Sequence, residues 1–488
     1  MVLVSTKRVP AEQLTDPGVH DSTCRQMIEE DVVETTTIGV DLGVTSASDV
    51  AVAEGATVTA TRKVASTPET LTAMFTKLGA HGPVNVVVES TAMAWFVAAV
   101  AVLRSGIDAT VFRVSGTKAA ALRKFYRAHT KTDRIDARVL ARMPLVDDGL
   151  HELVLPDAGE LALKRLVVLR NKLVGQTVKV ADRVRSTLHW AAPGLLSGRE
   201  AVTDGFVAVL ARWPDLRRLA AARPATIAKV GQMSKARAEK IRDAAAAAVA
   251  FYDGLVDFDA LAVEFEIAAT QHATLKAQVV RLEQRIAALH AEQYPDDVLL
   301  SIPGVGTVIA SVIRGCVGNL QRFTNLAAFR AYTGLVPRES SSGSSERRGK
   351  ISKAGPSMLR WSLYLAADTA RKWDPQLAEL YRRLMVERGR HHHQALCAVA
   401  SHLVGRIWAV VRDNRPYQWR DLDDQPITRE QARAIATSLA VDPETRQRLR
   451  QQRGPDASHP RQPKAPHDHD RPSPDDLTEH ALKVASSP

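Results

Sequence analysis

Apolar positions in the first third of the chain follow strand-like patterns broken by helix-like ones. β-branched residues in 36–42, 46–52 and 57–65 predict three short strands, with turns at Gly43 and Gly55. Continuous apolar runs at 84–89 and 107–114 predict two further strands, the first buried on both faces. Helical spacing predicts helices over 68–82, 93–105 and 115–127. Three antiparallel strands followed by alternating helix and strand predict an α/β domain over residues 36–150.

From residue 151 onward the helical period dominates. Residues 158–190 predict one long helix, and 257–294 carry near-heptad Leu, Val and Ile that would pair with it. We expect a helical, coiled-coil middle over 151–295, with a small basic helical insert within 191–256. A long helix that packs only within its own chain is the alternative. Residues 296–415 predict an all-α C-terminal domain. Residues 1–35 and 416–488 lack apolar period and predict a flexible extension and a mostly disordered tail.

The net charge of the chain indicates which kinds of partner the protein binds. The net charge of +11 and a pI near 9.6 indicate nucleic acid or another polyanion. Cys24, Cys316 and Cys397 lie far apart without metal-ligand spacing, so we expect free thiols in a reducing compartment. We find no apolar run near the roughly 18 residues that a membrane span requires, and no signal-peptide core at the N-terminus. We therefore expect a cytoplasmic protein without a membrane partner.

Four acidic residues fall at the ends of predicted elements. Asp41 ends the first strand, Glu89 ends the fourth, and Asp133 and Asp136 share one face of a helix. Brought to one sheet edge, their oxygens would suit Mg²⁺, and two such ions can assist attack on a phosphate. Taken singly, Asp41 also fits a turn and Asp133 a helix cap. Residues 113–142 add nine Lys or Arg, and three of them are expected to bind nucleic acid: Lys131, Arg134 and Arg138.

A serine cluster within residues 329–360 is the second candidate for chemistry. Ser340 to Ser342, Gly343, Ser344 and Ser345 are surrounded by basic side chains. A serine hydroxyl in such a setting can attack a phosphodiester while the cations offset the developing charge. An ordinary Ser/Gly linker is the alternative. The basic residues expected to bind nucleic acid here are Arg338, Arg347, Arg348, Lys350 and Lys353.

The sequence IPGVG at 302–306, followed by an apolar helical pattern, predicts a helix-hairpin-helix. Gly304 and Gly306 would let the turn place backbone N–H groups against a DNA phosphate. A plain helical turn is the alternative. The three adjacent residues His391 to His393 point in different directions on a helix, so we do not expect them to bind a metal ion.

These motifs together resemble a known family. GVDLG, VVVEST and KTDRIDA resemble the Asp-Glu-Asp-Asp motifs of insertion-sequence transposases whose N-terminal domain is similar to the Holliday-junction resolvase RuvC. In that resemblance Asp41, Glu89, Asp133 and Asp136 stand at the metal-binding carboxylates. The later motif is similar to the C-terminal domain of these transposases and places the nucleophile at Ser342, although the sequence alone leaves a one-residue shift open. Its matching residues are Gly334, Leu335, Pro337, Arg338, Ser342, Gly343, Ser352, Lys353 and Gly355.

The resemblance implies a ribonuclease H-like (RuvC-like) N-terminal domain and catalysis with Mg²⁺. It further implies a covalent phosphoserine intermediate, and a dimer or tetramer whose half-sites come from different protomers. A guide (bridge) RNA would pair with donor and target DNA, and the protein would be associated with the bacterial nucleoid.

Two other functions stay open, and a third is disfavoured. The first is a Holliday-junction-type metal-dependent endonuclease, in which water attacks and the serines only bind phosphate. The second is a nucleic-acid-binding protein without enzymatic activity. The third, an actin-like ATPase suggested by IGVDLGVTSAS, lacks the second phosphate loop and the adenosine motif which that fold requires.

Overall fold

The computed structural model describes residues 35–43, 46–90, 93–126, 130–196, 201–342 and 345–452. For residues 321, 339–342, 345–348 and 449–452 it describes the backbone alone. The chain divides into two compact units, Met1–Leu155 and Pro156–Pro488. The predicted N-terminal extension up to residue 34 and the end of the predicted tail from residue 453 lie outside the described residues, as does Cys24.

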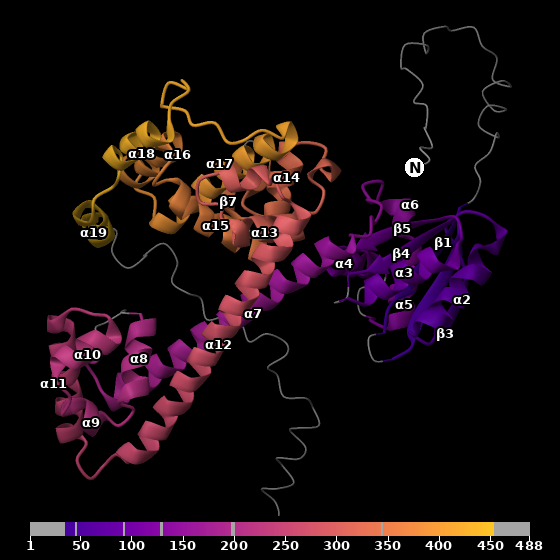
Figure 1. Ribbon diagram of the computed structural model, residues 1–488. Coiled ribbons are helices and arrows are strands. Elements are labelled where there is room, and N and C mark those ends of the chain that lie inside the picture. The colour runs from indigo at the N-terminus through magenta and orange to yellow at the C-terminus, as the bar shows by residue number, and fades with distance from the viewer. Residues whose placement is uncertain are drawn as a thin grey trace, which may run out of the picture. The chain divides into compact units, whose positions relative to one another are not determined.

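The first unit contains a five-stranded mixed sheet in the order β3-β2-β1-β4-β5. β1 pairs antiparallel with β2, β2 antiparallel with β3, and β1, β4 and β5 are parallel. This confirms the predicted α/β domain, and the mixed sheet is consistent with a ribonuclease H-like domain (Figure 1). The strands are β1 (Thr36–Asp41), β2 (Ser48–Glu54), β3 (Thr57–Val64), β4 (Val84–Glu89) and β5 (Ala109–Val114).

The two faces of this sheet are covered differently. Large apolar side chains such as Ile38, Val40 and Val88 face α2 (Pro68–Leu78) and α3 (Ala94–Ser105) and form the main core of the unit. The opposite face carries small residues under α5 (Asp133–Ala141). A Cβ atom at Gly39 would lie 2.3 Å from the Ala137 carbonyl oxygen, so glycine is needed for α5 to approach β1.

The other described helices of this unit are η2 (Gly79–His81), α4 (Gly116–Tyr126) and α6 (Met143–Val146). Beyond α6 the chain returns to the sheet, where the Leu153 N–H donates to the Val111 carbonyl at 2.7 Å. Leu153 and Leu155 pack on the main core of the unit. The unit therefore ends at residue 155, a few residues beyond the expected boundary at 150.

Two long helices, α7 (Ala158–Ala191) and α12 (Phe258–Gln293), organise the second unit. They run antiparallel, because Glu160 contacts Tyr294, Arg170 pairs with Glu283, and Arg183 donates to Gln271. An insert of four helices packs against one end of this pair through a core of its own (Figure 1). The insert helices are α8 (Asp204–Arg212), α9 (Leu216–Ala220), α10 (Pro224–Gly231) and α11 (Lys235–Phe251).

At the other end, α13 (Thr307–Val317) packs against α7 and leads into the C-terminal helices. Their shared core surrounds α17 (His392–Asp413), which contributes residues such as Leu396, Leu403 and Ile407. The other elements of this part are η3 (Val298–Ser301), η4 (Leu320–Arg322), α14 (Leu326–Thr333), α15 (Ser357–Ala370), α16 (Pro375–Arg382), η5 (Arg383–Glu387), α18 (Arg429–Ser438) and α19 (Pro443–Gln452).

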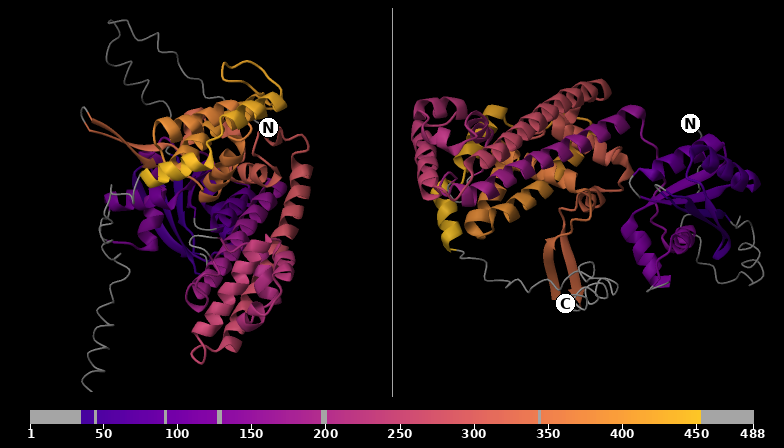
Figure 2. Two further views of the ribbon diagram at one scale, coloured as in Figure 1. Left: turned by 90° about the vertical axis from the view of Figure 1, so that its left-hand side faces the viewer. Right: turned by 90° about the horizontal axis from the view of Figure 1, so that it is seen from below.

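The C-terminal part is not all-α as predicted. β6 (Pro337–Ser342) and β7 (Ser345–Ile351) form an antiparallel hairpin where the pattern indicated a flexible loop. Figure 2 shows the hairpin projecting from the helices. The sequence signal for it is Gly-Ser between two runs of similar length, which is typical of a two-residue hairpin connection. The abundance of serine, with few apolar residues, concealed that signal.

The predicted disordered tail from residue 416 also needs correction, because its first part contains the helices α18 and α19. Ala432, Ala436 and Val441 are buried against the helical unit. Two alanines spaced four apart bury one narrow helix face, which a search for large apolar residues overlooks.

One described helix, α17, is long and apolar enough to cross a membrane by length and composition, which the sequence pattern did not reveal. Its apolar residues lie in the core of the C-terminal helices. The core helix of a globular unit passes the same test.

Candidate active site

Strand register places acidic residues side by side at the end of β1. Asp41 pairs directly with Asp49 of β2, and Val40 lies beside Val88 of β4, so that Glu89 follows next to Asp41. Residues in register on neighbouring strands project from the same face of a sheet. This face is the one that α5 covers, and three carboxylates therefore meet beneath that helix.

The start of α5 adds the other two predicted acids. Thr132 caps the helix, its hydroxyl oxygen accepting from the Ile135 N–H at 3.3 Å. Asp133 and Asp136 then lie in the first turn, where the helix dipole favours negative charge. Asp133 is exposed, whereas Asp136 is buried.

The electrostatics of Asp41 show that these groups are close to one another. Burial raises the pKa of Asp41 from 3.8 to about 7, helped by repulsion from Asp136, Asp133, Glu89 and Asp49. The structure thus brings together all four carboxylates singled out in the sequence. Among the described residues, however, no three His, Cys, Asp or Glu side chains converge closely enough to hold a metal ion without rearrangement.

Asp49 is a fifth acid that the sequence motifs did not single out. Its side chain is buried, and its Oδ2 atom has no hydrogen-bond partner among the described residues. The nearest cation, Lys63 Nζ, lies 3.9 Å away on a largely exposed side chain. A buried carboxylate without a hydrogen bond is costly, and a divalent cation nearby would offset that cost. The donor atoms are of the oxygen type that Mg²⁺ takes, but binding would require these side chains to converge more closely. Asp49 lies eight residues from Asp41 and outside the acidic motifs. Only the pairing of β1 with β2 shows that the two residues are neighbours.

Arg123 of α4 holds Asp136. Its Nη1 atom lies 2.9 Å from Oδ1 and 3.0 Å from Oδ2 of Asp136, and both side chains are largely buried. The Asp136 carboxylate is therefore already neutralised by an arginine. Any ion that used Asp136 as a ligand would have to share it with this guanidinium or displace it.

Gly116, the first residue of α4, makes room for Glu89. A Cβ atom at this position would lie 2.7 Å from Glu89 Oε1. Glycine thus lets the carboxylate lie against the start of the helix. The sequence offered no signal for this role, since Gly116 is distant from every acidic motif.

The predicted basic residues near α5 are exposed, namely Lys131, Arg134 and Arg138. Arg138 also lines a cavity of about 380 Å³ beside α5, together with Tyr126 and Arg142. The Arg142 guanidinium lies 5.4 Å from the centre of the Tyr126 ring. A cationic and aromatic surface thus adjoins the carboxylates.

Ser342 is the last residue of β6, and its backbone pairs with Ser345 of β7. Gly343 and Ser344 lie outside the described residues, and the side chains of Ser340 to Ser342 and Ser345 are likewise not described. The assignment of Ser342 as nucleophile therefore stays a prediction.

Two glycines of the serine motif shape the base of the hairpin. Gly334 has a φ of +69°, and a Cβ atom at Gly355 would lie 1.6 Å from the Tyr332 carbonyl oxygen. Across this base, the Ser352 N–H donates to the Val336 carbonyl at 2.8 Å and the Lys353 N–H to the Gly334 carbonyl at 3.0 Å. These glycines therefore let the two ends of the hairpin meet.

The basic residues around the hairpin differ in whether their side chains make a hydrogen bond within the protein. Arg338 donates to the Ser352 carbonyl at 3.2 Å, whereas Lys350 and Lys353 are exposed. Lys353 also has a φ of +56°, a left-handed conformation uncommon outside glycine. The side chains of Arg347 and Arg348 are not described.

The two glycines of the IPGVG turn have different surroundings. Gly304 has a φ of +83°, and a Cβ atom there would lie 2.3 Å from the Ala366 carbonyl oxygen, so packing against α15 requires it. A Cβ atom at Gly306 would meet nothing within 4 Å. Only Gly306 thus borders open space at the start of α13, and the helix-hairpin-helix assignment stays a prediction.

Histidines 391 to 393 serve the fold. His392 Nδ1 lies 2.8 Å from the Tyr381 hydroxyl, and His393 Nδ1 lies 2.6 Å from the Tyr364 hydroxyl. Cys316 and Cys397 are free thiols, as expected.

The mixed sheet with acids at the ends of β1 and β4 fits a DNA-processing enzyme, and comparison with known families places the chain in the class of DNA-cutting and DNA-joining transposases. Residues 38–193 match the DEDD transposase domain of IS110 elements. Residues 296–382 match the family described as "Transposase IS116/IS110/IS902 family". The chain belongs to this IS110/IS116 family of transposases.

Relatives from actinobacterial insertion elements support the assignment. The chain is 29% identical to the "Insertion element IS110 uncharacterized 43.6 kDa protein" of Streptomyces coelicolor over 72% of this chain and 87% of that protein. It is 27% identical to the IS900 42 kDa protein of Mycobacterium paratuberculosis, over 60% and 74% respectively. It is 26% identical to the IS116 44.8 kDa protein of Streptomyces clavuligerus, over 63% and 75%.

Proposed function

We propose that this transposase cuts and rejoins the DNA strands of its insertion sequence through a serine nucleophile assisted by a carboxylate centre that binds Mg²⁺. The observation that carries the proposal is the gathering of acids at the end of β1, where burial, together with repulsion from the neighbouring acids, raises the pKa of Asp41 to about 7. Such a cluster is unfavourable in isolation and favourable around a cation. Asp41, Glu89, Asp133 and Asp136 would hold the ion, with Asp49 beside them.

The bound ion would offset the negative charge that develops on the phosphate oxygens. The Ser342 hydroxyl would attack the phosphorus, forming one P–O bond to serine and breaking one P–O bond to a sugar. The serine proton would leave with the departing sugar oxygen as a hydroxyl group. Attack by the hydroxyl of another strand would reverse these changes and restore the serine. Lys350 and Lys353 are exposed near the hairpin base, where they can bind the DNA backbone.

We further propose guidance by an RNA of the element, which would base-pair with donor and target DNA. A protein that relies on base pairing for sequence needs to bind only backbone and shape, which agrees with its net charge of +11. We also propose a dimer or tetramer, with α7 and α12 forming a coiled coil in the assembly. The nucleoid of a bacterial cytoplasm is the expected location.

A metal-dependent endonuclease of the Holliday-junction type is the second candidate. One observation favours it: the whole carboxylate centre lies within the first unit, so water could attack without the hairpin. The serines would then only bind phosphate.

The deciding experiment incubates the protein with Mg²⁺, labelled DNA carrying the ends of the element, and RNA transcribed from its flanks. Products are resolved on a denaturing gel with and without protease. We expect the unmodified protein to give a slow, protease-sensitive band. This band should be absent with Ser342→Ala and present with Ser341→Ala. Nicked DNA without an adduct would establish water as the nucleophile. Cleavage that persists in EDTA would remove the role of the metal.

A further inference from the structure

The C-terminal helices contain a cavity of about 490 Å³ that lies apart in sequence from both catalytic motifs. It opens between the turn before α13, the end of α15 and the loop before α18. Its volume falls in the range of sites that bind a small ligand. None of its eleven lining residues is acidic, whereas Arg429 provides a cation. The cavity therefore suits an anionic ligand.

One wall is the turn of residues 300–306, which ends at the start of α13. Gly306 is the N-cap of that helix, and no side chain caps it. Since a Cβ atom at Gly306 would meet nothing within 4 Å, the first N–H groups of the helix border open space. Such N–H groups, with the positive end of the helix dipole, bind phosphate oxygens well.

Another part of the lining is aromatic and cationic. Trp373 and Trp419 both line the cavity and both are partly exposed. The guanidinium groups of Arg429 and Arg433 lie 4.8 Å and 4.4 Å from the centre of the Trp373 ring. Tryptophan and arginine side by side are the groups on which unpaired bases stack.

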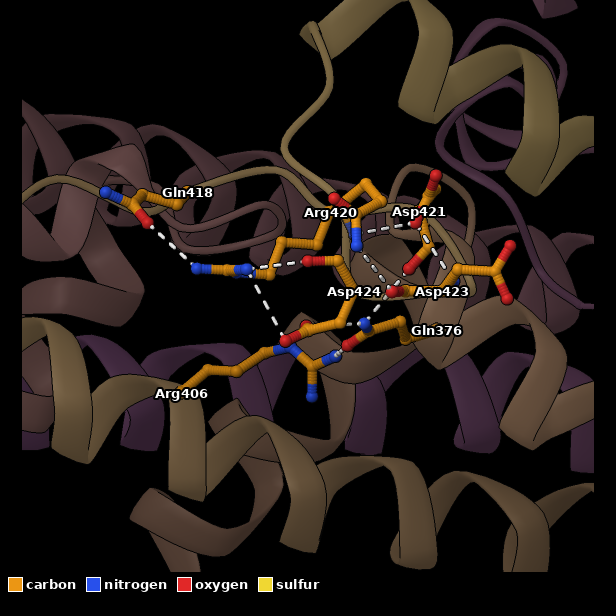
Figure 3. A network of polar contacts seen from close by, with 8 residues as sticks. Gln376, Arg406, Gln418, Arg420, Asp421, Asp423 and Asp424 are labelled. Atoms are coloured by element: carbon orange, nitrogen blue, oxygen red, sulfur yellow. Dashed lines mark hydrogen bonds and ion pairs between the residues drawn. The ribbon is translucent and has the colours of Figure 1, made fainter.

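Hydrogen bonds hold the loop that carries Trp419 in place. The Tyr417 N–H donates to Ser301 Oγ at 2.8 Å, and the Ile427 N–H donates to the Trp419 carbonyl at 3.1 Å. Figure 3 shows Gln376 at the centre of the adjoining network, donating to the Asp421 carbonyl at 3.0 Å and accepting from Arg406 at 3.0 Å. A wall fixed before binding lowers the entropy cost of binding a ligand.

We infer that this cavity binds one unpaired nucleotide of a nucleic-acid strand. Its base lies against Trp373 and Trp419, and its phosphate lies between Arg429 and the N-terminus of α13. A paired nucleotide does not fit this description, because its base faces are covered by stacking within the duplex. The inference rests on the proposed function in one respect, that the protein handles strands opened from a duplex. Trp419, Arg429 and Arg433 all follow residue 382, where the match to the transposase family ends.

Binding in EDTA tests the site without any strand cleavage. The probes are a fluorescein-labelled six-residue thymidine DNA, the matching six-residue uridine RNA, and a 12-base-pair DNA duplex. In Trp419→Ala and Arg429→Gln, we expect affinity for the single strands to fall about 5- to 100-fold, the usual range for one stacked base. Affinity for the duplex should change less than about twofold. The single-stranded probe that shows the larger loss identifies DNA or RNA as the natural strand.

Two matched controls lie on exposed positions near the insert. Trp190 is 51% exposed on α7, and the Arg218 side chain is 81% exposed on α9. Trp190→Ala and Arg218→Gln should bind the single strands as the unmodified protein does. Arg429 is exposed, so Arg429→Gln keeps the test decisive should Trp419→Ala disturb folding. A DNA six-mer without bases should not distinguish Trp419→Ala from the unmodified protein, whereas Arg429→Gln should still weaken its binding, because the phosphates remain.

Single-strand affinities that stay unchanged in both cavity variants overturn the inference, as does an equal loss of affinity for the duplex. This outcome is separable from failure of the proposed function. The binding assay needs neither Ser342 nor Mg²⁺, whereas the protease-sensitive adduct needs both.

Discussion

Single side chains in this transposase face opposite demands from folding and from chemistry. Asp41 is the clearest case, because an acid half-buried among four others destabilises the fold and yet prepares a cation site. Gly116 and Gly355 are equally constrained, since in each case a carboxylate or a carbonyl occupies the space of a side chain.

The charge on Asp41 should cost stability in a pH-dependent manner. Its folded-state pKa of about 7 exceeds the ordinary 3.8, so its contribution is most favourable below pH 3.8 and is lost as pH rises through 7. In EDTA at pH 8, Asp41→Asn should stabilise the protein by about 1–2 kcal/mol after solvent screening. At pH 5 the difference should fall to about a third of that value, and below pH 3.8 it should nearly vanish. Thermal denaturation at pH 8 and at pH 5 measures the stability difference at each pH, with the exposed Asp148→Asn as control. Lower stability of Asp41→Asn at pH 8 would contradict this account.

Gly355→Ala should disrupt the base of the serine hairpin. The added methyl group would lie 1.6 Å from the backbone oxygen of Tyr332, which cannot move without shifting α14. We expect a loss of about 1–3 kcal/mol in stability and a marked loss of strand cleavage. At Gly349 the added Cβ would lie 3.5 Å from the Arg338 carbonyl oxygen, an ordinary contact. Gly349→Ala should therefore retain stability and cleavage, and equal damage from both variants would refute the steric explanation.

At the scale of elements, the α7–α12 pair supports both the insert and the C-terminal helices. A small core of Leu163, Val167, Ile286, Leu289 and Val312 joins the pair to α13. A polar network of His290, Asp297, Ser311 and Arg314 at the end of α12 fixes the turn into η3. Apolar burial therefore supplies the stability of this junction, and the polar network its geometry.

Ile286 is fully buried in that core, so Ile286→Ala should leave a cavity. We expect a loss of about 2–4 kcal/mol in the free energy of unfolding of the helical unit. Val280, on the same helix, is 51% exposed, and Val280→Ala should cost less than about 0.5 kcal/mol. Urea denaturation followed by circular dichroism compares them. Similar losses in both variants would argue against the packing of α7, α12 and α13 described here.

Asp297 should make the helical unit sensitive to acid. Burial alone would raise its pKa, but the His290 ring, whose Nε2 lies 3.1 Å from Oδ2 of Asp297, and hydrogen bonds from Arg314 outweigh that effect and hold the pKa well below 3.8. Its contribution is therefore present above pH 3.8 and is lost as pH falls further. Asp297→Asn should cost about 3 kcal/mol at pH 7, because it leaves Arg314 without its counter-charge.

Denaturation at pH 7 and at pH 3 measures this dependence. The difference between Asp297→Asn and the unmodified protein should shrink at pH 3. A difference of constant size would mean that shape, and not charge, is what the network requires.

At the scale of the whole molecule, the carboxylates and the serine hairpin belong to different compact units. The oligomer proposed above predicts a composite site built from two protomers. In a closed oligomer each site would take its acids from one chain and its serine from another.

Mixing two inactive variants tests this arrangement. Asp41→Asn and Ser342→Ala should each be inactive alone, and their mixture should recover about a quarter of the wild-type sites in randomly formed dimers. Adduct formation on the denaturing gel measures the recovery. Mixed oligomers that form and yet stay inactive would place both halves of the site in one protomer.

The sequence by itself determined the local elements and the class of chemistry. Periodicity predicted the sheet of the first unit and the two long helices, because strand and helix patterns depend on neighbours within a few residues. Acid spacing and the serine motif indicated the transposase family. Tertiary structure decided the rest. Asp49 joins the acids only through strand register, Arg123 reaches Asp136 from another helix, and Trp419 lines the same cavity as Trp373 only through a folded loop. Such contacts depend on how separate elements pack, and no short-range pattern encodes them.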